Sequence, residues 1–69
     1  MRRVWVESSV LASVGYQAGT LEVEFVGGRV YRYLEVPAAE HAALMWATSH
    51  GTYFNEHIRN DYRYVKVSR

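Results

Sequence analysis

The clearest pattern along the chain is an alternation of hydrophobic and polar residues from Leu21 to Phe25. Every second residue is hydrophobic, and the residues between them are glutamates. A period of two is typical of a β-strand with one buried face and one face in water. Residues 29–36 are rich in β-branched and aromatic side chains, and two glycines, Gly27 and Gly28, separate the two runs. The pattern predicts a β-hairpin against which the rest of the chain packs.

The length of the hairpin loop decides which face each side chain of the second strand takes, because a shift of one residue moves every side chain to the other face. A two-residue loop would place Tyr31 and Tyr33 on the glutamate face and Arg32 among aliphatic residues. An odd loop, formed by a type I turn with Gly28 in the left-handed conformation, places both tyrosines on the hydrophobic face. We favour the odd loop because it keeps the charge of Arg32 beside the glutamates, although an arginine stem can also pass hydrophobic neighbours.

The remaining hydrophobic segments complete a small sheet. A first strand region runs from Val4 to Tyr16 and is broken by two serines, and Gly15 within it marks a bulge or a close approach of two backbones. The polar residues 17–20 have the length of a hairpin connection, so these strands and the central hairpin form an antiparallel meander. Residues 62–67 alternate again and predict a last strand at the sheet edge, where basic side chains discourage aggregation.

A first helix is predicted after the hairpin. Pro37 removes a strand hydrogen-bond donor and suits the first turn of a helix, which we expect to end at about Ala47. The second half of this helix is hydrophobic on all sides. Leu44 is the expected core residue, with either Trp46 or the side of Ala43 and Ala47 beside it.

A second short helix is predicted after a polar break. Ser49 or Thr52 can cap its first turn, and the helix extends to about residue 60. Phe54, Ile58 and Tyr62 recur at every fourth position, which is the spacing of one helix face. We expect these three side chains to point into the core.

Length and composition limit the classes of protein. The 69 residues predict one domain, spanning residues 1–69, of α+β class: a small antiparallel β-meander with two short helices packed on one face and a C-terminal edge strand. The hydrophobic content of 49% excludes a disordered tail. The chain has no cysteine, which argues against a disulfide framework and fits a reducing cytoplasm. No hydrophobic run approaches the roughly 20 residues that cross a bilayer, so we expect no membrane partner.

The net charge of +1 is unevenly distributed. Arg2 and Arg3 contribute +2, residues 4–58 contribute −4, and residues 59–69 contribute +3. If the two basic ends met in the fold, they would form a small patch for a polyanion. The simpler interpretation is that they are solubilising termini.

A catalytic or metal site is weakly supported. His41, His50 and His57 lack the spacing of a metal-binding pair, so we expect no metal and no cofactor. His57 and Asp61 are four residues apart and could orient an imidazole for acid–base chemistry, but surface pairs of this kind are far more common. We therefore assign no catalytic residue and expect a protein that is not an enzyme.

The run Arg-Val-Tyr-Arg-Tyr at residues 29–33 suggests recognition of an anion. Tyr31 and Tyr33 share one face of the strand, which is the geometry with which sheet surfaces stack nucleic-acid bases, and neighbouring arginines can contact phosphates. In the favoured register the same tyrosines are half-buried core residues, and the glutamates nearby would repel phosphate. The sequence is compatible with both interpretations.

Several motifs together resemble the KTSC domain, a family named for an extension at the C-terminus of some lysyl-tRNA synthetases and found also in short bacterial and phage proteins. They are the hydrophobic series at 21–25, Tyr31 and Tyr33, Val36-Pro37, the Ser-x-Gly-x-Tyr-Phe-Asn sequence at 49–55, and Ile58-Arg59. The resemblance extends from Ser8 to Tyr62 and implies RNA binding through attachment to a synthetase. Glu40 and His41 stand where it leads us to expect hydrophobic or aromatic residues, so this end of the first helix should sit differently or be wetter.

The expected function is that of a small non-enzymatic binding module, with RNA or another anion as the partner. A protein–protein adaptor is the alternative, and a small nuclease-like enzyme is the least favoured. The expected binding residues, which combine the basic aromatic strand with the positions implied by the resemblance, are Arg29, Tyr31, Arg32, Tyr33, Ser49, Tyr53, Asn55 and Arg59. Arg59 has two alternatives: it contacts the anion, or it folds back onto Asp61 or a sheet glutamate as an internal clamp.

Overall fold

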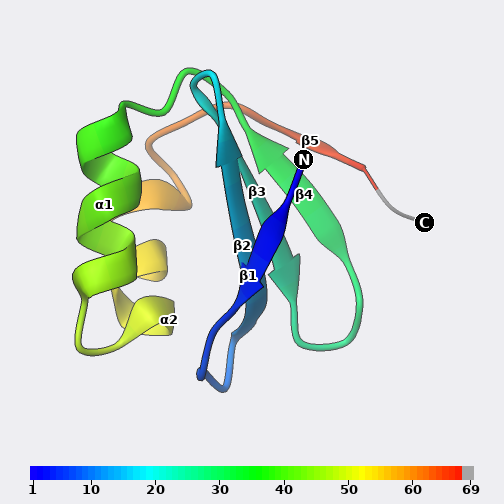
Figure 1. Ribbon diagram of the computed structural model, residues 1–69, viewed down its shortest axis with the longest axis vertical. Coiled ribbons are helices and arrows are strands. Elements are labelled where there is room, and N and C mark those ends of the chain that lie inside the picture. Colours follow the sequence, from blue (N-terminus) through cyan, green and yellow to red (C-terminus); the bar gives the residue numbers. More distant parts are fainter. Residues whose placement is uncertain (68–69) are drawn as a thin grey trace.

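The computed structural model, which describes residues 1–67, shows a five-stranded antiparallel sheet with helices on one face (Figure 1). The strands are β1 (Arg3–Trp5), β2 (Leu11–Gln17), β3 (Thr20–Phe25), β4 (Val30–Tyr33) and β5 (Tyr64–Lys66), and they lie in this order across the sheet. The helical segments are α1 (Ala38–Trp46), α2 (His50–Tyr53) and η1 (Phe54–Ile58), the last a π-helical turn. The α+β class, the meander, the two short helices and the C-terminal edge strand are confirmed.

The register of the central hairpin is the one that the charges predict. Val23 lies opposite Tyr31, and Glu22 lies opposite Arg32. The loop differs in one respect from the expectation. The N–H of Gly28 donates to the carbonyl of Phe25 at 2.9 Å, which closes a four-residue turn with Gly27 third, at φ +111°. A positive φ at that position belongs to a type II turn, so the expected type I turn is wrong.

The face of the sheet that points away from the helices carries a charged cluster. Glu22 is only 6% exposed and lies between two guanidiniums, at 2.8 Å from Nη1 of Arg3 and 2.7 Å from Nε of Arg32. The Ser13 hydroxyl donates to the Glu24 carboxylate at 2.9 Å. We call this the outer face. Burying a carboxylate is costly unless it is paired, and here both oxygens of Glu22 have partners.

The hydrophobic core lies between the opposite face of the sheet and the helices. Its buried members are Leu11, Val14, Leu21, Val23, Tyr33, Val36, Leu44, Phe54 and Ile58. Gly15 marks a close approach, as the sequence suggests, because a Cβ there would lie 2.7 Å from the carbonyl oxygen of Arg2. Only glycine lets the N-terminal segment come so near to β2.

Helix α1 is attached to the sheet by Leu44, its one fully buried residue among those described. Trp46 is 88% exposed, whereas Ala43 and Ala47 are half-buried, so the inward stripe follows the alanines and the Trp46 alternative is wrong. The polar residues of the first turn have polar or aromatic partners. Glu40 accepts hydrogen bonds from two tyrosine hydroxyls, and His41 stacks on Tyr16 with ring centroids 4.6 Å apart.

The second helical segment begins at a serine cap and ends in a wider turn. The Ser49 hydroxyl accepts a hydrogen bond from the Thr52 N–H at 3.2 Å, which confirms Ser49 as the cap. In η1 the N–H of Arg59 donates to the carbonyl of Phe54, five residues earlier, at 2.9 Å. Phe54 and Ile58 are fully buried, as expected, but Tyr62 is only half-buried and bonds to α1.

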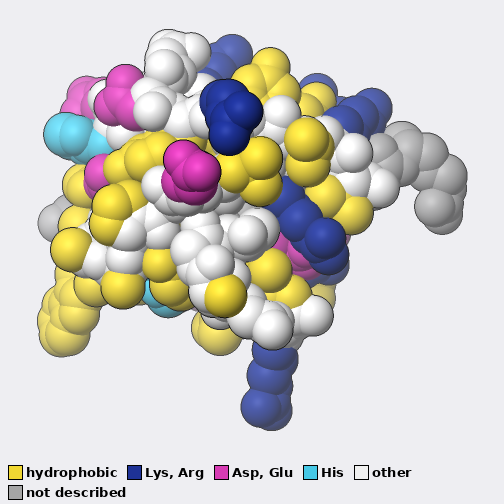
Figure 2. All heavy atoms as spheres, turned by 90° about the horizontal axis from the view of Figure 1, so that it is seen from above, with side chains coloured by type: hydrophobic (Ala, Val, Ile, Leu, Met, Phe, Trp, Pro, Cys, Tyr) yellow, Lys and Arg dark blue, Asp and Glu magenta, His cyan; other side chains and the backbone are white. Residues whose placement is uncertain are grey.

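The two basic ends of the chain do not form one patch through neighbouring strands, because β1 and β5 are the opposite edges of the sheet. Figure 2 shows basic, acidic and hydrophobic side chains interspersed on the face seen from above. Over residues 1–67, no helix has the length and hydrophobicity that a membrane crossing needs.

Candidate nucleotide-binding cleft

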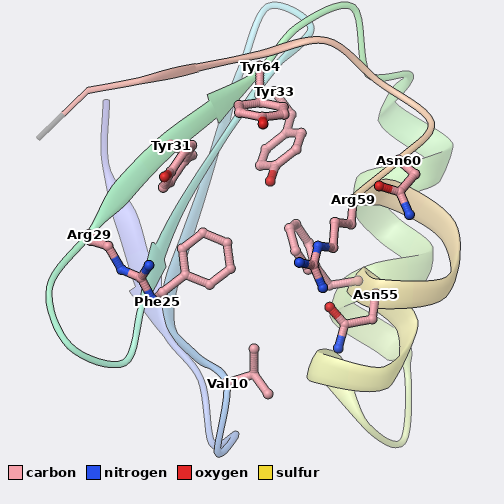
Figure 3. A pocket seen from close by; sticks show the side chains of 10 residues that line it. Val10, Phe25, Arg29, Tyr31, Tyr33, Asn55, Arg59, Asn60 and Tyr64 are labelled. Atoms are coloured by element: carbon pink, nitrogen blue, oxygen red, sulfur yellow. The ribbon is translucent and has the colours of Figure 1, made fainter.

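A cleft of about 450 Å³ lies between the β4–β5 side of the sheet and η1 (Figure 3). Its size falls within the roughly 300 to 1,000 Å³ of typical small-molecule sites. The lining residues are Val10, Phe25, Arg29, Tyr31, Tyr33, Phe54, Asn55, Arg59, Asn60 and Tyr64. The sheet contributes most of an aromatic wall, η1 adds Phe54 to it, and the helical side also contributes polar groups.

Most neighbouring rings of the aromatic wall meet edge to face at steep angles. Phe25 meets Tyr31 at 80° and Phe54 at 73°, with centroids 5.6 and 5.4 Å apart. Tyr64 of β5 meets Tyr31 at 64°. Edge-to-face contacts of this kind add stability beyond the buried area, so the wall is preorganised.

Two arginines lie on opposite sides of this cleft. Arg29 follows the hairpin loop and Arg59 ends η1, and Figure 3 shows their side chains on opposite sides of the aromatic wall. Among residues 1–67, neither guanidinium forms an ion pair with a carboxylate. Arg59 is exposed, so the clamp alternative, with Asp61 or a sheet glutamate, is not what the structure shows. Both cations are available to an anion in the cleft.

The pKa of the Tyr33 hydroxyl reflects its surroundings in this cleft. Burial raises the pKa of Tyr33 from 10.0 to about 12, and the neighbouring Tyr64 adds to the rise, while the positive charge of Arg59 opposes it. Tyr33 therefore stays neutral over the physiological range and acts as a hydrogen-bonding group rather than as an anion.

We expect the protein to lose stability above about pH 10 because of Tyr33. Between pH 10 and 12 the unfolded chain releases the Tyr33 proton while the folded chain keeps it, so the folded state binds more protons and the free energy of unfolding falls as pH rises. The full shift corresponds to about 3 kcal/mol. Urea denaturation from pH 8 to 12 measures the loss. Tyr33→Phe should reduce the slope, and an unchanged slope in that variant would contradict the assignment.

The structure brings together five of the eight expected binding residues: Arg29, Tyr31, Tyr33, Asn55 and Arg59. The other three lie elsewhere for clear reasons. Arg32 is on the outer face in the ion pair with Glu22, Ser49 caps α2, and the Tyr53 hydroxyl donates to Glu40.

Sequence reasoning missed the other half of the lining. Tyr64 lies opposite Tyr33 only because β5 pairs with β4, and Asn60 directly follows Arg59. The adjacency of Asn60 was a usable signal. The contribution of Val10, Phe25 and Phe54 to the cleft could not be predicted from the sequence, because their hydrophobic side chains fit an ordinary core equally well.

The histidines take no part in the cleft. His57 stacks on Tyr53 with centroids 4.3 Å apart, and its carboxylate neighbour is Glu56 at 4.0 Å. The spacing in the sequence instead suggests Asp61 as the carboxylate beside His57. Within the described part of the chain, no three His, Asp or Glu side chains are grouped so that they could hold a metal ion.

Comparison with family models gives a match to the KTSC domain over residues 7–67. An uncharacterised protein of Stutzerimonas stutzeri is 43% identical over 70 residues, and the match covers 97% of this chain and 99% of that protein. The crystal structure of a KTSC domain protein from Yersinia pestis has a TM-score of 0.90 and 34% identity, with 97% of each chain covered.

A further similarity is to part of a much longer protein. The lysine–tRNA ligase of Nostoc punctiforme is 34% identical over 64 residues, which cover 90% of this chain but 11% of the ligase. A second ligase, from a Nostoc species, matches at 33% identity over the same share of its length. The similarity is therefore to one small part of each enzyme.

Proposed function

This chain belongs to the KTSC domain family, and from that premise we propose that it is a non-enzymatic module of the cytoplasm that binds RNA through the cleft beside η1. The observation that carries the proposal is the pair of arginines, free of ion pairs with carboxylates within residues 1–67, on opposite sides of an aromatic wall. Single-stranded nucleic acid is bound by this combination of cations and aromatic rings.

The charge distribution supports an anionic ligand at the cleft. On the outer face, Glu22 pairs with Arg3 and Arg32, and Glu24 pairs with Arg3. These sheet glutamates therefore do not neutralise the cleft arginines. None of the lining residues is acidic. An unopposed guanidinium forms strong, bidentate hydrogen bonds with phosphate.

The relatives support RNA as the anion. Two relatives carry the name lysine–tRNA ligase, and each matches this chain over a small part of its length. A module attached to an enzyme that acts on tRNA is suitably placed to contact RNA. The activity of the ligases themselves is not part of the proposal, since the match covers 11% of their length.

Arg59→Ala tests the proposal. We expect the variant to bind a labelled single-stranded RNA at least about tenfold more weakly, because a hydrogen bond to a charged group contributes about 1.5 to 3 kcal/mol. Stability should change by less than about 1 kcal/mol, since Arg59 is exposed. Fluorescence anisotropy at two salt concentrations measures binding. Two phosphate contacts predict a slope of log K against log salt of about −1.4.

Arg63→Ala is the matched control. Arg63 is also exposed, lies outside the cleft and forms no ion pair with the described residues, so its loss changes the net charge equally. In Arg63→Ala, the RNA affinity should fall by less than about threefold. Equal losses in the two variants would show diffuse attraction to a polyanion, and no RNA binding by the unmodified protein would reject the proposal.

A protein–protein adaptor is the second candidate, because two tryptophans are exposed. Trp5 is 77% exposed on β1, and Trp46 is 88% exposed at the end of α1. Exposed tryptophans are frequent anchors of protein interfaces. The cleft favours RNA over this alternative, since its arginines and asparagines form a converging polar site.

A further inference from the structure

The angles between the cleft rings limit how many bases they can stack. A platform for successive bases needs aromatic faces exposed side by side along a strand. Here Tyr33 meets Phe54 at 84°, Phe25 meets Tyr31 at 80° and Tyr31 meets Tyr64 at 64°, while Tyr33 and Tyr64 are tilted by 41°. A ring whose edge abuts its neighbour's face cannot continue a stack across that neighbour. The wall therefore has room to stack one planar group, and it does not form a flat surface on which several bases could stack.

The apolar floor of the cleft supports the same limit. Val10 closes the end nearest α2 in Figure 3, and Phe54, which is 1% exposed, also lines the cleft. The whole space is about 450 Å³, which is in the lower half of the range for small-molecule sites. An extended strand of several nucleotides would have to leave it after the first.

Two asparagines supply hydrogen-bond acceptors as well as donors, and a phosphate would use only the donors. Asn55 and Asn60 come from the helical side of the cleft and are exposed. An asparagine amide carries a donor and an acceptor side by side, which matches the polar edge of a base. A site for phosphate alone needs donors only, because a carbonyl oxygen repels an anion. The cleft thus pairs a base-reading group with a phosphate-binding group.

We propose that the cleft holds one nucleoside monophosphate unit, with its base against the aromatic wall, the edge of the base on Asn55, and its phosphate on Arg29 or Arg59. The inference rests on the RNA-binding function proposed above and deepens it. The unit has two sources, a nucleotide within RNA and a free mononucleotide. Both carry the same base and phosphate chemistry.

A competition experiment on the full chain tests this inference. A labelled ten-nucleotide single-stranded RNA is displaced by AMP, CMP, GMP, UMP, adenosine or inorganic phosphate, and the free mononucleotides are also titrated directly by calorimetry. We expect the best mononucleotide to bind within about tenfold of the RNA, and adenosine and inorganic phosphate at least about tenfold more weakly than that mononucleotide. RNA longer than two nucleotides should gain little affinity.

The outcomes separate the two proposals. If RNA binds through Arg59 but no mononucleotide competes, the RNA function stands and the one-nucleotide site is wrong. If a mononucleotide binds and RNA does not, the site stands and the RNA function is wrong. Inorganic phosphate competing as well as the best mononucleotide would also overturn the inference, because no base would be read. Absence of binding by both ligands would reject both.

Asn55→Ala gives an independent readout of base contact. Its affinity for the best mononucleotide should fall about fivefold or more, while weak binding of inorganic phosphate should not change, because the amide contacts the base edge. Gln17→Ala removes an exposed amide at the end of β2, outside the cleft, and should leave both affinities unchanged. Equal losses for nucleotide and phosphate would contradict the assigned role.

Discussion

Replacing Phe54 by alanine should unfold most of the protein near physiological temperature. The ring is 1% exposed and contacts Phe25 and Tyr33 edge to face, at 5.4 and 5.3 Å between centroids. Removing a buried phenylalanine costs about 3 to 5 kcal/mol. A chain of this length has a total stability of roughly 3 to 10 kcal/mol. The loss is therefore comparable with the whole free energy of folding.

Thermal denaturation followed by circular dichroism measures the effect of Phe54→Ala. Its Tm should fall by more than about 12 °C, since 1 kcal/mol corresponds to roughly 4 to 8 °C in a domain of this size. Phe54→Leu retains much of the buried volume and should lose less. A Tm like that of the unmodified protein would show that Phe54 does not join the helices to the sheet.

Leu44→Ala should give the second large effect, because Leu44 is the residue through which α1 reaches the core. Its side chain is 0% exposed. A buried Leu→Ala substitution costs about 2 to 5 kcal/mol, depending on how far the surroundings collapse into the cavity. The helix has few other buried contacts to compensate, since the described remainder of α1 is half-buried or exposed.

Trp46→Ala is the matched control on the same helix. Trp46 is two residues further along and 88% exposed, so its removal should change the free energy of unfolding by less than about 0.5 kcal/mol. Urea denaturation of the two variants in parallel gives the comparison. A larger loss in Trp46→Ala than in Leu44→Ala would mean that the helix turns its other side to the sheet.

The hairpin was predictable because its information is local. The period of two placed Val23 and Phe25 on the buried side, and the cost of burying a charge decided the register that puts Arg32 opposite Glu22. The turn type was not predictable, since Gly27 and Gly28 are both free to adopt positive φ. Helix α1 was ambiguous for a different reason: a segment that is hydrophobic on all sides has no preferred face until the sheet supplies one.

Residue type alone could not assign the roles of the polar site candidates. Ser49 and Tyr53 have side chains that suit a ligand equally well, but one caps α2 and the other bonds to Glu40. A hydroxyl takes whichever partner the fold brings to it. Such partners lie far away in the sequence, so a local pattern does not contain them.

The sequence by itself determined the strands, the hairpin register and the basic aromatic character of β4, because periodicity and charge pairing act over a few residues. The tertiary structure alone decided the cleft. Arg29 and Arg59 are brought to one cavity, and Tyr64 is set beside Tyr33, only when β5 pairs with β4 and η1 packs over the sheet. A binding site built from distant segments exists only once the chain has paid the entropy of closing the loops between them.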